Sequence, residues 1–105
     1  MSRHKARITV LKCMDNRRIQ EQERFDGASG PCSAFKEGQV FLAGWDLPEG
    51  FCSFAWADIH DDLTMIQCGG SPGYIAPDHT MVSCCKDGLC PVVFKIECTS
   101  SPCPS

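Results

Sequence analysis

Hydrophobic and polar residues follow two different periods along this chain, and each period predicts its own kind of element. Residues 7–13 are rich in β-branched side chains, as is typical of a strand packed on at least one face. Residues 39–43 predict a second strand. From Cys52 onward, apolar residues recur at positions 52, 56, 59, 63 and 66, all within about 40° of Cys52 on a helix of 3.6 residues per turn. This pattern predicts a long helix with Cys52 in its apolar stripe.

Weaker signals complete the secondary structure. Asp15 or Asn16 is a good N-cap for a short surface helix over residues 17–25, because both side chains accept hydrogen bonds from free backbone N–H groups. Near the end of the chain, residues 81–85 and 91–98 flank a turn that contains Asp-Gly, which predicts a hairpin. In its second strand Val92, Phe94 and Ile96 share one face, because side chains alternate along a strand.

The predicted order is strand, helix, strand, helix, strand, strand. It favours a small α+β domain over residues 1–98, with about four mostly antiparallel strands, two helices and a C-terminal hairpin. Residues 99–105 contain two prolines and three serines, and we expect them to form a flexible tail.

Composition narrows the class of protein. The hydrophobic fraction of 43% suffices for a core in a chain of 105 residues. The formal net charge is −3, and the one short basic cluster lacks interleaved aromatic residues, so we expect no nucleic-acid binding. No apolar run is long enough for a membrane span.

Cysteine is the unusual residue, with nine copies, an odd number and no Cys-x-x-Cys spacing. The N-terminus also lacks the apolar run and cleavage pattern of a secretory leader. A secreted disulfide scaffold would show an even count and such a leader. We therefore expect a cytoplasmic protein with reduced thiols.

Several short motifs carry a resemblance to a known family. They are Gly30-Pro31-Cys32, Phe35 to Gln39, Glu49-Gly50-Phe51-Cys52 with Trp56, Asp58 and Ile59, and Cys84-Cys85-x-Asp-Gly followed by Pro91 to Glu97. With these the chain resembles a family of small bacterial and fungal proteins of about this length that are generally described as uncharacterised. The resemblance implies a one-domain α+β fold and brings no established activity.

The shared motifs single out Cys32, Cys52, Cys84 and Cys85 as a candidate metal-binding set. Soft thiolates favour Cu(I), Zn(II) or an iron–sulfur cluster. The short ligand spacings typical of zinc and of iron–sulfur sites are missing from this set. Dispersed cysteines suit Cu(I), which we place first, with Zn second.

Two other interpretations compete with a metal site. Free cysteine is often buried as a small apolar residue, so these thiols could serve packing alone. A catalytic thiol is the other: Cys52 is the candidate nucleophile, His79 a partner for the thiols of Cys84, Cys85 or Cys32, and Asp58 a candidate acid, base or supporting group.

The leading hypothesis is a small cysteine-ligated metal enzyme that isomerises, rearranges or oxidises a small apolar, electrophilic or unsaturated metabolite of specialised metabolism. The alternative is a non-enzymatic module that binds metal through thiols or senses redox state. The expected partner is a small-molecule substrate, and a homo-oligomer is compatible with this sequence.

Overall fold

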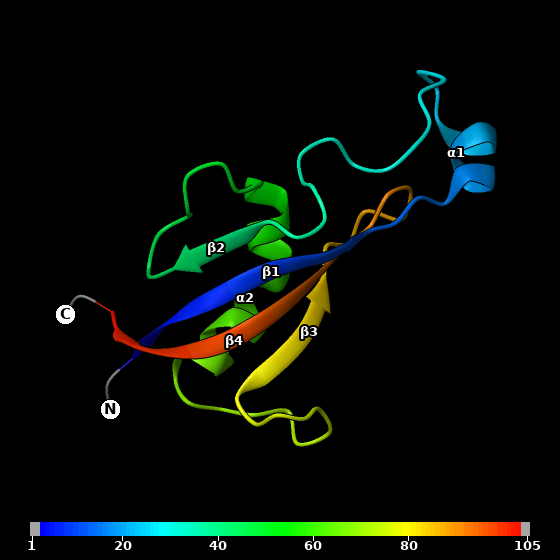
Figure 1. The fold of residues 1–105 in the computed structure, drawn as a ribbon. Coiled ribbons are helices and arrows are strands. Elements are labelled where there is room, and N and C mark those ends of the chain that lie inside the picture. Colours follow the sequence, from blue (N-terminus) through cyan, green and yellow to red (C-terminus); the bar gives the residue numbers. More distant parts are fainter. Residues whose placement is uncertain (1–2, 104–105) are drawn as a thin grey trace.

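A four-stranded antiparallel sheet carries one long helix on one of its faces (Figure 1). The structure is a computed structural model that describes residues 3–103. In chain order the elements are β1 (His4–Cys13), α1 (Arg17–Glu23), β2 (Val40–Ala43), α2 (Ser53–Gln67), β3 (Thr80–Cys84) and β4 (Val92–Pro102). This order confirms the α+β class, the β-α-β-α-β-β arrangement and the C-terminal hairpin of β3 and β4.

The two long strands form the centre of the sheet, whose order is β2-β1-β4-β3. β1 pairs with β4 so that Ile8 lies opposite Ile96 and Val10 opposite Phe94. Side chains alternate along each strand, so these residues point to the same face, and each is at most 1% exposed. The face they share is the one that α2 covers (Figure 1).

The apolar stripe of α2 packs on this face of the sheet. Ile59, Leu63 and Ile66 are fully buried, as their spacing predicts, and Trp56 is half-buried against the same core. A group of rings lies at one end of the core, where Phe35, Phe51 and Phe94 contact one another edge-on or tilted. Burial of these side chains is the main contribution to the stability of the fold.

Several element boundaries differ from the sequence prediction, among them the ends of α1 and β4. α1 ends at Glu23 rather than at residue 25, because Arg24 takes an extended conformation with φ −83° and ψ 119°. β4 continues to Pro102, although the sequence predicted a tail from residue 99. The reason is that β1 begins as early as His4, which gives Pro102 a strand partner. Residues 104–105 of the predicted tail lie outside the described residues.

The remaining segments extend the molecule beyond the sheet. α1 lies past the end of the strands, next to the segments that lead into β2 and β4 (Figure 1). The molecule measures 48 × 29 × 21 Å along its principal axes. Neither α1 nor α2 has the length and apolar character that crossing a membrane requires.

Candidate functional site

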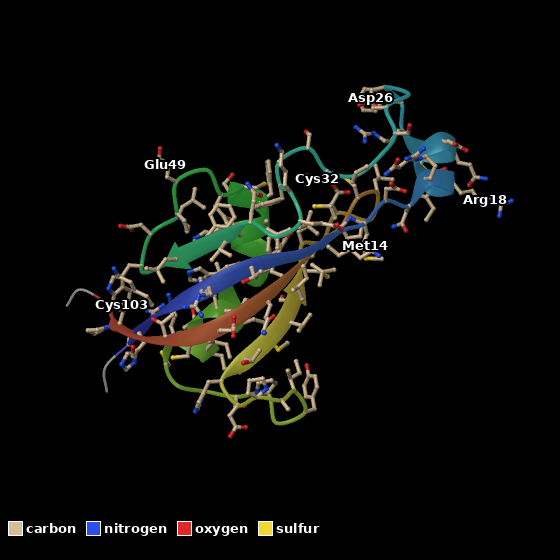
Figure 2. The ribbon with its side chains drawn as sticks, in the orientation of Figure 1. Met14, Arg18, Asp26, Cys32, Glu49 and Cys103 are labelled. Carbon is tan, nitrogen blue, oxygen red and sulfur yellow. The ribbon has the colours of Figure 1, made fainter. Side chains whose placement is uncertain are left out.

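Three of the four cysteines in the candidate metal-binding set line one pocket. Cys32 comes from the segment between α1 and β2 (Figure 2), Cys52 directly precedes α2, and Cys85 directly follows β3. The pocket has a volume of about 470 Å³. It is lined by Cys32, Phe35, Cys52, Phe54, Ala55, Ala57, Asp58, Cys85, Lys86, Asp87 and Val92. Sequence motifs that are far apart in the chain therefore meet at one mostly apolar hollow.

Cys52 lies at the start of α2 and not within its apolar stripe. It occupies the N-cap position, with φ −69° and ψ 127°, and the first helical residue is Ser53. The predicted helix thus begins one residue later than the hydrophobic period suggested. The thiol is half-buried against the core and makes no capping hydrogen bond. This position places the sulfur near the positive end of a 15-residue helix.

The other two pocket sulfurs accept backbone hydrogen bonds. The N–H of Val92 donates to Cys85 Sγ over 3.3 Å, and the N–H of Ala34 donates to Cys32 Sγ over 3.4 Å. A hydrogen-bond donor directed at sulfur is a favourable contact for a thiolate. All nine cysteines lie within residues 3–103 and are free thiols.

Cys84 does not reach the pocket. It is exposed, whereas its neighbour Cys85 packs against the core. Adjacent residues at a strand end point to opposite sides, so only one of this pair can face inward. Of these two adjacent cysteines, Cys85 is the one that faces the core.

Asp58 connects α2 to the segment that carries Cys85. Its Oδ2 accepts a hydrogen bond of 2.8 Å from the backbone N–H of Lys86, and both residues line the pocket. Asp87 shapes the same segment, because its Oδ1 accepts the backbone N–H of Leu89. That hydrogen bond holds the pKa of the Asp87 carboxyl below its usual value. Asp58 thus holds the segment that follows Cys85 against α2.

His79 lies at the far end of β3 from the pocket. It precedes Thr80, the first residue of the strand, whereas Cys85 follows the last. Six residues of extended chain span about 20 Å. The ring Nδ1 of His79 lies 3.0 Å from the carbonyl oxygen of Gly70 and is exposed. The structure does not bring this histidine to Cys32, Cys84 or Cys85.

The side chains of residues 3–103 do not form a metal site with three or more ligands. No group of three or more His, Cys, Asp or Glu side chains among them is arranged to hold a metal ion. The predicted set of Cys32, Cys52, Cys84 and Cys85 therefore does not form a three- or four-ligand site. A tetrahedral zinc site, which needs at least three protein ligands, does not fit this arrangement.

Two cysteines outside the candidate metal-binding set lie close to this pocket. Burial raises the pKa of the Cys13 thiol, and Glu37, Cys32 and Cys85 add smaller contributions, so Cys13 is a neighbour of two pocket thiols. Cys90 is 8% exposed and donates its S–H to Asp87 Oδ2 over 3.3 Å. Neither residue belongs to the motifs that single out the candidate set, and no short-range pattern places residues 13 or 90 next to residue 32.

Comparisons with protein-family models, with curated proteins and with solved structures give no significant match to this chain. The evidence for function therefore comes from the geometry of the pocket.

Proposed function

We propose that this protein is a small thiol-dependent enzyme that binds a small apolar, electrophilic or unsaturated molecule and isomerises it at Cys52. The observation that carries the proposal is the meeting of Cys32, Cys52 and Cys85 in one mostly apolar pocket of about 470 Å³. A concave apolar site with a few polar groups is the usual form of a small-molecule site. A thiol at its wall adds a nucleophile.

Cys52 is the best-placed nucleophile of the three. Its sulfur lies at the N-terminus of α2, where the first backbone N–H groups have no partners within the helix. A residue of the Ser, Thr, Asp or Asn type would cap this helix better. A cysteine at this position therefore points to a chemical role for the sulfur.

The proposed reaction is a cis–trans isomerisation of an α,β-unsaturated carbonyl compound. The Cys52 thiolate adds to the β-carbon, so that a C–S bond forms, the C=C π bond breaks and the electron pair moves to the carbonyl oxygen as an enolate. The former C=C bond is now a single bond, and the substrate rotates about it. The enolate then re-forms the C=C bond and expels the thiolate, so the cycle consumes neither proton nor oxidant. Lys86, which lines the same pocket, supplies a positive charge for the enolate oxygen.

Of the metals that the sequence favours, Cu(I) remains compatible with the thiol pocket. Cu(I) accepts thiolates as soft ligands, and two of the three pocket sulfurs are enough for a two-coordinate ion. Bound copper would supply a π-binding Lewis acid for the substrate double bond. The proposal does not depend on it, because the isomerisation above needs only the thiol.

The experiment compares reduced protein with and without one equivalent of Cu(I). Metal-free protein is incubated with cis-benzalacetone, and conversion to the trans isomer is followed by ultraviolet absorbance and NMR. We expect saturable conversion that falls at least about 100-fold in Cys52→Ala, the loss typical when a nucleophile is removed. Cys84→Ala is the matched control, because it removes an exposed thiol outside the pocket and is expected to retain full activity.

The other outcomes identify the competing functions. Conversion only in the copper-loaded protein would replace the thiol mechanism with a metal-dependent one. Stoichiometric copper binding without conversion would support the non-enzymatic metal-binding module. A rate in Cys52→Ala equal to that of the unmodified protein would overturn the assignment of Cys52.

A further inference from the structure

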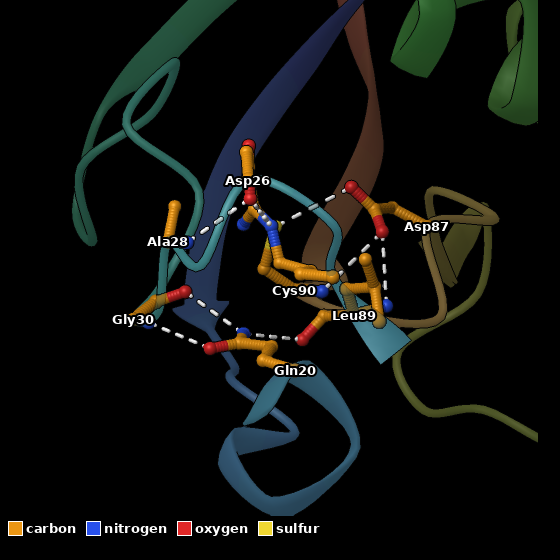
Figure 3. A network of polar contacts seen from close by, with 8 residues as sticks. Gln20, Asp26, Ala28, Gly30, Asp87, Leu89 and Cys90 are labelled. Atoms are coloured by element: carbon orange, nitrogen blue, oxygen red, sulfur yellow. Dashed lines mark hydrogen bonds and ion pairs between the residues drawn. The ribbon is translucent and has the colours of Figure 1, made fainter. Parts of the chain in front are cut away.

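A second, more polar hollow adjoins the thiol pocket. It has a volume of about 350 Å³ and shares Cys32 with the thiol pocket. Its lining consists of Arg24, Ala28, Ser29, Gly30, Pro31, Cys32, Ser33 and Cys90. Figure 3 shows how the segment of Asp26, Ala28 and Gly30 passes Cys90 here. We call this second hollow the polar cleft. A ligand that passes Cys32 would contact both hollows.

The polar cleft offers hydrogen-bonding groups that have no protein partner. Across the part of the chain that the structure describes, the hydroxyls of Ser29 and Ser33 make no hydrogen bond. Arg24 uses Nε and Nη2 for Asp26, which leaves the N–H groups of Nη1 for a ligand. These three side chains are suited to a ligand that both donates and accepts hydrogen bonds.

The charge around the cleft argues against an anionic ligand. The Arg24 guanidinium holds Asp26 through two contacts, Nε to Oδ1 at 3.1 Å and Nη2 to Oδ2 at 3.0 Å. Arg24 lowers the pKa of the Asp26 carboxyl, so the pair is ionised at neutral pH and its charges cancel. Asp87 adds a negative charge beside Arg24 and Cys90, where a third hollow joins all three residues. A carboxylate or phosphate would meet no uncompensated positive charge here.

We infer that the substrate is an uncharged amphipathic molecule. Its unsaturated apolar part lies against the thiols, and a hydroxyl, amide or carbonyl group binds in the polar cleft to Ser29, Ser33 and Arg24. This inference rests on the proposed function, because it takes the thiol pocket as the place of reaction. It adds a second binding region and a preference for a neutral head group.

The test separates binding from reaction by using ligands that cannot react. Two saturated phenyl ketones are compared, one bearing a hydroxymethyl group on the ring and the other a carboxylate. Binding is measured by titration with NMR detection of the backbone amides. We expect the alcohol to shift signals of Ser29 and Ser33 as well as Cys52, and to bind roughly tenfold more tightly than the carboxylate.

The Ser29→Ala, Ser33→Ala double variant is expected to lose this tenfold preference while it still binds the unsubstituted ketone. Ser101→Ala, at the distant exposed end of β4, is the matched control and should bind all three ketones unchanged. Tighter binding of the carboxylate, or an alcohol that shifts no signal of residues 29–33, would overturn the inference. Normal alcohol binding without isomerisation of cis-benzalacetone would instead contradict the proposed function alone.

Discussion

The cysteines of this chain have very different surroundings, although their side chains are chemically identical. Cys84 and Cys68 are exposed, whereas Cys90 is buried and donates its S–H to Asp87. Burial, reinforced by the negative charge of Asp87, raises the pKa of the Cys90 thiol to about 12. Cys90 is therefore kept neutral and unreactive, and the reactive thiols are to be sought among the half-buried ones of the pocket.

The raised pKa of Cys90 makes stability depend on alkaline pH. The neutral Cys90 thiol stabilises the folded state. This contribution to stability is fully present below the unfolded pKa of 9.0 and is lost as pH rises towards about 12. From this group we expect the free energy of unfolding to fall by up to about 1.4 kcal/mol per pH unit in that window. Cys90→Ala should show a shallower decline when urea unfolding is measured at several pH values. Cys84→Ala, which removes an exposed thiol, should keep the original slope; equal slopes for all three proteins would refute the prediction.

Among the elements, α2 combines a well-packed body with a poorly capped start. Ile59, Leu63 and Ile66 are fully buried, yet Cys52 at the N-cap makes no side-chain hydrogen bond to the first turn. The buried stripe follows directly from the period of apolar residues, so it could be predicted from the sequence. The first residue of the helix could not, because a period does not define where the helical conformation begins.

Cys52→Ser should therefore separate stability from activity. A serine hydroxyl accepts a hydrogen bond from a backbone N–H of the first turn, so we expect Cys52→Ser to be about 1 kcal/mol more stable than Cys52→Ala. Both variants should lose isomerisation, because neither has the nucleophilic sulfur. Urea unfolding and the cis-benzalacetone assay measure the two effects on the same samples. An active serine variant, or one no more stable than the alanine variant, would contradict this account of the N-cap.

In the molecule as a whole, the site depends on contacts between segments that are distant in sequence. Sequence motifs identified Cys32, Cys52 and Cys85, but only the tertiary structure shows that they share a pocket and that Cys84 does not. His79 was a reasonable partner by residue type alone; strand β3 separates it from the pocket. Alternation and helical period are local properties, whereas the path of a loop is set by the contacts that it makes elsewhere.

Gln20 supplies such contacts for the loops around the site. It is fully buried on α1, its Oε1 accepts the N–H of Gly30 over 2.6 Å, and its Nε2 donates to the carbonyls of Gly30 and Leu89 over 2.9 and 2.7 Å (Figure 3). One side chain thus joins α1, the segment that leads to Cys32 and the segment between β3 and β4. A buried side chain with all its hydrogen bonds made fixes the relative positions of the groups that it joins.

Gln20→Ala should loosen all three segments together. It leaves the buried N–H and carbonyl of Gly30 without their partner, and each unsatisfied group costs about 1–3 kcal/mol, so we expect a loss of at least about 2 kcal/mol in the free energy of unfolding. Gln22→Ala is the matched control, because it removes the same side chain from an exposed position of the same helix. Hydrogen exchange should show faster exchange of the Gly30 amide in the first variant only. Equal stability of the two variants would mean that the segments around Cys32 are positioned by their own packing, and the polar cleft would then owe its shape to the backbone of residues 28–33 instead of to Gln20.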